Sequence, residues 1–78
     1  MNKPVKKDIL NKAFIAGKRA RLLGKNRIPG QDPFVSEMIS GNHPLTIAFL
    51  KESENIKNDH NHLNRQIMNE WSRGWDQK

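Results

Sequence analysis

The sequence predicts a small all-α domain, and three observations support this prediction. Near the C-terminus, apolar residues recur at every fourth position, as they do on one face of a helix. Near the N-terminus, a second apolar set recurs at spacings of three and four. Between the two sets, prolines and glycines mark helix starts and ends, and no segment alternates polar and apolar residues as a strand would. We therefore expect one domain, residues 1–78, built from helices alone.

The first helix is predicted to run from about Pro4 to Leu23. Pro4 suits the first turn of a helix, and Gly24 tolerates the left-handed conformation that ends one. The apolar stripe of this helix consists of Ile9, Ala13, Ala16, Ala20 and Leu23. The stripe is mostly alanine and Gly17 lies at its margin, so another helix could approach closely here.

A loop and a short second helix are predicted next. Residues 25–31 are rich in glycine, asparagine and proline, a composition typical of a loop. Asp32 followed by Pro33 is typical of an N-cap and the first turn of a helix. A helix from Phe34 to Ser40 would then stop at Gly41.

The same start signal predicts a third helix from Pro44 to about Lys57, with either Asn42 or His43 as its N-cap. A polar turn over residues 58–61 would end it.

The last helix is predicted from about His62 to Trp75. Its apolar face consists of Leu63, Ile67, Trp71 and Trp75. We expect both tryptophans to be largely buried against the alanine face of the first helix. Gly74 costs a helix about 1 kcal/mol relative to alanine. Either close packing against the first helix or helix termination would explain it.

The positive charge of the chain is concentrated in its first third. Residues 1–27 hold nine basic residues against one acidic residue, a net charge of +8, whereas residues 28–78 hold five against seven, a net charge of −2. Such a one-sided field attracts polyanions. The candidate RNA-binding residues lie in one basic segment: Lys18, Arg19, Arg21, Lys25 and Arg27.

A helical cationic face followed by a flexible basic loop suits the irregular backbone of folded RNA. Composition alone does not separate RNA from DNA or anionic lipid. A membrane surface is disfavoured because an alanine stripe offers few bulky groups for insertion. We therefore expect RNA as the partner and no membrane.

Catalysis fits the sequence poorly. It contains no phosphate-binding glycine motif, no cysteine and no paired carboxylates. His60 and His62 are two positions apart, which is a poor arrangement for a metal site, so they are assigned to a solvated turn in which one caps the last helix. We expect a protein that is not an enzyme and binds no metal or cofactor. The chain begins with Met1 and shows no signal peptide, so a cytoplasmic location is expected.

Several short motifs together resemble the ribosome modulation factor group. They are Ala13-Phe14-Ile15-Ala16-Gly17, Ala20, Gly24, Asp32-Pro33-Phe34 and Trp71-Ser72-Arg73-Gly74-Trp75. The resemblance covers about residues 10–34 and 62–77. It implies a long first helix packed on a C-terminal Trp-x-x-Gly-Trp helix.

The resemblance also implies binding to the small ribosomal subunit near the end of its rRNA, which would block initiation and favour hibernating, dimerised ribosomes. The residues that would then face rRNA are Lys18, Arg21, Lys25 and Arg27. Those that would hold the fold are Gly17, Gly24, Pro33, Phe34, Trp71, Gly74 and Trp75. Diverged members of this group occur on mobile elements, so the resemblance also allows a phage-encoded effector that acts on a host machine.

Residues 35–61 depart from the family pattern as an insertion with two short helices and a net charge of −2. The insertion contains apolar residues that could be exposed: Met38, Ile39, Ile47 and Phe49. They would either dock a host protein, as in a phage effector or inhibitor, or enlarge a small core. A DNA-binding helix-turn-helix is a third hypothesis, but the early turns of its recognition helix would be apolar.

Overall fold

The computed structural model describes residues 3–77, and within them the chain forms four α-helices, a single turn of 3₁₀ helix and no strand. The elements are α1 (Lys3–Leu22), η1 (Pro29–Gln31), α2 (Pro33–Ser40), α3 (Pro44–Lys51) and α4 (Ile56–Trp75). They form an elongated body of 38 × 20 × 18 Å. The all-α prediction is confirmed.

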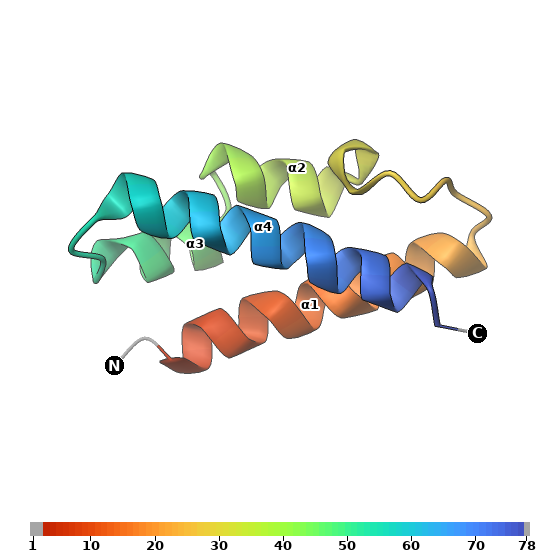
Figure 1. Ribbon diagram of the computed structural model, residues 1–78, viewed down its shortest axis with the longest axis horizontal. Helices are drawn as coiled ribbons and strands as arrows, with labels where there is room; N and C mark the ends of the chain where they lie inside the picture. Colours follow the sequence, from red (N-terminus) through yellow and green to blue (C-terminus); the bar gives the residue numbers. More distant parts are fainter. Residues whose placement is uncertain (1–2, 78) are drawn as a thin grey trace.

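The two long helices, of 20 residues each, form the backbone of the molecule. Figure 1 shows α1 and α4 side by side and running in the same direction, while α2 runs back above them. This parallel arrangement is possible because α2 and α3 return the chain to the end where α1 began. The predicted packing of the first helix on the C-terminal helix is thereby confirmed.

Two glycines allow α1 and α4 to touch through their backbones. A Cβ atom at Gly17 would collide with the backbone carbonyl of Trp71, and one at Gly74 would collide with the carbonyl of Phe14. Each helix therefore places a glycine against the main chain of the other. Of the two explanations for Gly74, close packing is the one that the structure supports.

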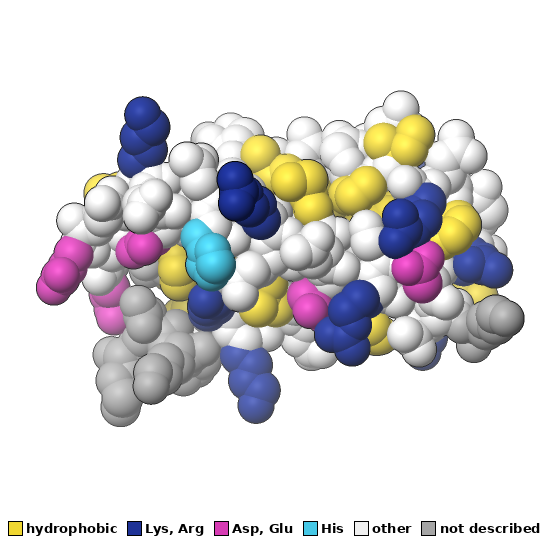
Figure 2. All heavy atoms as spheres, in the orientation of Figure 1, with side chains coloured by type: hydrophobic (Ala, Val, Ile, Leu, Met, Phe, Trp, Pro, Cys, Tyr) yellow, Lys and Arg dark blue, Asp and Glu magenta, His cyan; other side chains and the backbone are white. Residues whose placement is uncertain are grey.

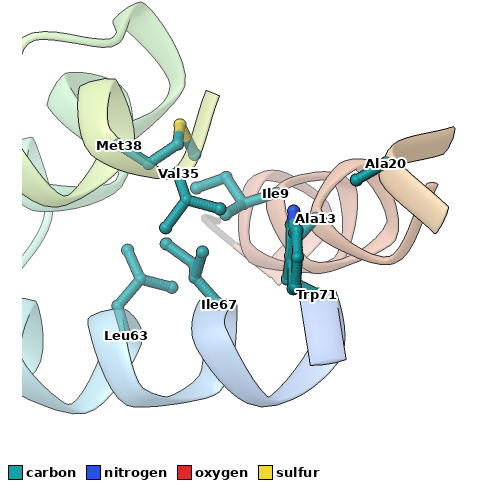
Figure 3. Packing of buried hydrophobic residues seen from close by; sticks show 8 residues of the cluster. All are labelled: Ile9, Ala13, Ala20, Val35, Met38, Leu63, Ile67 and Trp71. Carbon is teal, nitrogen blue, oxygen red and sulfur yellow. The ribbon is translucent and has the colours of Figure 1, made fainter. Parts of the chain in front are cut away.

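The core lies between α1, α2 and α4, as the close-up in Figure 3 shows. Its buried hydrophobic residues are Ile9, Ala13, Ala20, Val35, Met38, Leu63, Ile67 and Trp71. The predicted apolar stripe of the first helix faces this core. Ile9, Ala13 and Ala20 are buried, and Ala16 is partly buried. Leu23 was predicted to belong to this stripe and is instead 67% exposed, because α1 ends one residue earlier.

The inserted segment contributes directly to this core. Val35 and Met38 of α2 are fully buried, and the hydroxyl of Thr46 in α3 donates to the Met38 carbonyl at 3.3 Å. Of the two alternatives for these apolar residues, docking or core, Met38 therefore belongs to the core. Ile47 is 45% exposed, whereas Ile39 and Phe49 are partly buried against the core. The segment is therefore part of the packed domain.

The starts of α2 and α3, each marked by a proline, are capped as predicted. The Asp32 carboxylate accepts a hydrogen bond from the Phe34 amide at 2.8 Å, and His43 Nδ1 accepts one from the Leu45 amide at 3.1 Å. Of the two candidate caps for α3, His43 is therefore the one used. Gly41 ends α2 with a φ of 84°.

The boundary between α3 and α4 differs from the prediction. α3 ends at Lys51, not Lys57, and α4 begins at Ile56, not His62. The predicted polar turn, residues 58–61, lies inside α4.

The physical reason is a cap that lies earlier in the sequence. The Asn55 side chain accepts from the Asn58 amide at 3.3 Å, and the Ser53 hydroxyl donates to the Asp59 carboxylate at 2.6 Å. Asp59 also places a negative charge in the first turn of α4, where the helix dipole favours it. His60 and His62 consequently lie within the helix, and neither caps it, contrary to expectation.

Candidate nucleic-acid interface

The C-terminal end of α1 and the loop after it carry a cluster of exposed basic side chains. Lys18, Arg19 and Lys25 are all exposed, and within residues 3–77 none of them forms an ion pair. Lys25 follows Gly24, which ends α1 with a φ of 75°. The Lys25 amide donates back to the Ala20 carbonyl at 3.0 Å, which fixes where the loop leaves the helix.

Arg21 lies in the same region but is held by the C-terminal helix. Its guanidinium carbon lies 4.5 Å from the centre of the Trp75 ring, and Nη1 donates to the Trp75 carbonyl at 3.1 Å. A stacked arginine keeps its charge and remains able to attract a phosphate. Arg21 therefore combines a packing role with a positive charge at the surface.

Arg27 is paired with Asp76, an acidic residue that lies 49 positions away in the sequence. Its Nε and Nη2 atoms each lie 2.9 Å from a carboxylate oxygen of Asp76. The hydrogen bond from Arg27 lowers the pKa of Asp76, and the same bond raises that of Arg27. The two charges largely cancel at the surface, so Arg27 has the weakest field of the five predicted RNA-binding residues.

Trp75 fixes the basic loop in place. Its indole Nε1 donates to the Lys25 carbonyl at 3.0 Å, in addition to the contact with Arg21. Together with the Arg27–Asp76 pair, the end of α4 therefore holds the loop at two points, Lys25 and Arg27. The prediction that Trp75 is largely buried was only partly correct, because the ring is partly exposed while it makes these contacts.

Two basic residues beside the groove between α1 and α4 are paired with acidic residues. Lys12 lies 3.8 Å from the Asp8 carboxylate, and Arg73 lies 3.1 Å from that of Glu70. Both acids line a shallow groove between α1 and α4. This groove offers mixed charge to a ligand, unlike the surface around Lys18.

Acidic side chains gather at the end of the molecule that lies opposite the basic loop. The end at which α3 leads into α4 carries acidic side chains, as the space-filling view in Figure 2 shows, and that connection contains Glu52 and Glu54. The basic loop lies at the opposite end, beside the C-terminus of α4 (Figure 1). The acidic end also carries basic residues, because Lys51 and Lys57 flank these acids and the start of α1 with Lys6 lies at the same end (Figure 1). Its charge is therefore mixed.

Within residues 3–77, no three side chains of the metal-binding types come together as a metal site. No helix in this part of the chain is long and apolar enough to cross a membrane.

The sequence did not reveal the contacts that hold the site together. Asp32, predicted as an N-cap, also accepts a hydrogen bond from Trp71 Nε1 at 3.0 Å. The partners Asp32 and Trp71 are 39 positions apart, and Arg27 and Asp76 are 49 apart. Such long-range pairs leave no periodic signal in a single sequence.

Comparison with family models, with curated proteins and with solved structures gave no match. The resemblance to the ribosome modulation factor group therefore rests on the short sequence motifs alone.

Proposed function

We propose that this protein is a non-enzymatic RNA-binding regulator that uses the basic end of α1 to occupy a site on structured RNA and so prevent its use. The observation that carries the proposal is the exposed trio of Lys18, Arg19 and Lys25, which form no ion pair within residues 3–77, beside the stacked Arg21. Neutralising RNA phosphates with such residues releases counterions, which drives binding. Following the resemblance, the proposed target is rRNA of the small ribosomal subunit, and the proposed consequence is reduced translation initiation.

Folded RNA suits this surface better than regular DNA does. The positive groups of the protein are distributed over the end of α1 and the loop after it. This distribution matches the irregular phosphate path of folded RNA. The helix-turn-helix alternative finds less support, because α3 has eight residues and its one basic residue, Lys51, lies in the last turn. The host-protein alternative through residues 35–61 is weakened because Val35 and Met38 of this segment are buried.

The test replaces Lys18, Arg19 and Lys25 together with glutamate. These side chains are exposed and make no ion pair with the described part of the chain, so the fold should persist, whereas Arg21→Glu would also disturb Trp75. We expect the triple variant to bind an RNA hairpin far more weakly in fluorescence anisotropy. The slope of log affinity against log salt should fall by about two to three, because each replaced cation leaves one RNA phosphate without a partner. Co-sedimentation with small ribosomal subunits should decline in parallel.

The matched control replaces three exposed basic residues elsewhere, Lys51, Lys57 and Arg65, with glutamate. Both triple variants change the net charge equally, so a difference between them reports position and not total charge. The proposal fails if the two variants lose RNA binding to the same extent, or if the first still co-sediments with ribosomes as the original protein does.

A further inference from the structure

A groove of about 590 Å³ lies between α1 and the start of α2. Its apolar lining consists of Ile15, Ala16, Ala20, Leu23, Pro33 and Phe34. Ile15 and Arg19 of α1 and Leu23, which directly follows α1, are spaced by four residues. The Leu23 amide donates to the Arg19 carbonyl at 3.0 Å, so the three form one strip beside the groove. Ile15 is 45% exposed and Leu23 is 67% exposed, so this end of α1 presents aliphatic surface that no part of residues 3–77 covers.

The same groove is bordered by positive charge. Lys12, Arg19 and Lys25 line it, and the latter two have no ion pair within residues 3–77. Asp32 is the one acid in the lining, and both of its carboxylate oxygens are occupied. Oδ1 accepts from the Phe34 amide at 2.8 Å, and Oδ2 accepts from Trp71 Nε1 at 3.0 Å. The field in the groove is therefore positive above an apolar floor.

We propose that this groove binds an acidic amphipathic helix of a partner protein. Apolar side chains at every third or fourth position of such a helix would enter the groove, and its flanking carboxylates would meet Arg19 and Lys25. The inference goes beyond RNA binding, because it assigns a second partner and depends on two aliphatic residues that phosphate recognition does not require.

Other occupants fit the groove less well. A second copy of this chain would bring the same cations together across a two-fold axis. A flat bilayer does not match a concave surface. Leu22, which is 81% exposed and of the bulky aliphatic type that inserts into a bilayer, does not line the groove. A nucleobase platform needs exposed aromatic rings, whereas Phe34 is partly buried and the exposed lining residues are aliphatic.

The experiment uses the full chain and a fluorescein-labelled 15-residue peptide, with leucine at every third or fourth position on one helical face and glutamate along both flanks. We expect saturable binding in fluorescence anisotropy that weakens with salt. Replacing Ile15 and Leu23 with serine should weaken binding at least about tenfold. Arg19→Gln with Lys25→Gln should weaken it and flatten its salt dependence. Circular dichroism should show the helical content of both variants unchanged, since these side chains are exposed.

The matched control is Leu22→Ser with Ile47→Ser, which removes one exposed leucine and one exposed isoleucine outside the groove. It should bind the peptide as the original protein does. Equal binding by this control and the groove variant overturns the proposal. Equal binding of a peptide with the same composition but dispersed leucines, or of one with lysine in place of glutamate, also overturns it.

Parallel measurements with an RNA hairpin and with anionic phospholipid vesicles distinguish the other partners. The Ile15 and Leu23 variant should bind RNA as the original protein does. Its loss of peptide binding therefore tests the groove independently of the RNA proposal. If that variant loses RNA or vesicle binding while peptide binding persists, the groove belongs to that other ligand and the peptide proposal is wrong.

Discussion

Trp71 shows how one side chain can connect three helices. Its ring is 1% exposed between α1 and α4, and its Nε1 donates to Asp32, whose other oxygen caps α2. Burial of Trp71 follows from the period-four pattern, so the sequence was sufficient to predict it. Its hydrogen bond to Asp32 was not predictable. The Asp32-Pro33 signal that predicts a helix cap is the same in the sequence whether or not the aspartate also accepts a hydrogen bond from a distant indole.

We predict that Trp71→Ala lowers the free energy of unfolding by about 3–5 kcal/mol, because it leaves a large cavity and removes a partner of Asp32. Trp75→Ala should cost less, about 1–2 kcal/mol, because Trp75 is partly exposed. Urea denaturation followed by circular dichroism measures both values. Equal losses for the two variants would contradict the difference in burial.

At the scale of elements, local signals predicted the helices bounded by proline and glycine but not the boundary between α3 and α4. The α2 helix, bounded by Asp32-Pro33 and Gly41, was predicted to within one residue. No glycine or proline separates α3 from α4, so the cluster of asparagine, aspartate and histidine at residues 58–61 was mistaken for a turn. Those residues belong to a helix whose start is set by Asn55.

The reciprocal glycine contacts make a prediction about the α1–α4 pair. Gly17→Ala and Gly74→Ala should each destabilise the protein by about 1–3 kcal/mol or more, because the new methyl group would meet backbone, which cannot rotate away. Alanine normally favours a helix over glycine, so destabilisation here would run against helix propensity. Gly30→Ala is the control: its Cβ meets nothing within 4 Å, and a change within about 0.5 kcal/mol is expected. Thermal melts that rise for the two helix variants would exclude backbone contact.

At the scale of the whole molecule, α2 and α3 complete the fold that the resemblance describes as two helices. The chain has to return to its starting end before α4 can run parallel to α1, and the same segment covers the core (Figures 1 and 3). The sequence left open whether this segment serves packing or docking. Burial of Val35 and Met38 favours packing, and the groove beside Ile15 moves the candidate docking surface to α1.

Replacing residues 36–60 with a short Gly/Ser linker should therefore unfold the protein. The deletion removes Met38 and the helices over Ile9, Leu63 and Ile67, each of which is at most 1% exposed. Burial of one such aliphatic side chain contributes roughly 1.5–3 kcal/mol, so exposing several together approaches the entire stability of a small domain. We expect no cooperative thermal transition. The point variant Ile47→Ser, at an exposed position of α3, should melt close to the original protein. If the deletion variant instead unfolds cooperatively near the original midpoint, α1 and α4 are self-sufficient and the inserted helices are free to serve another partner.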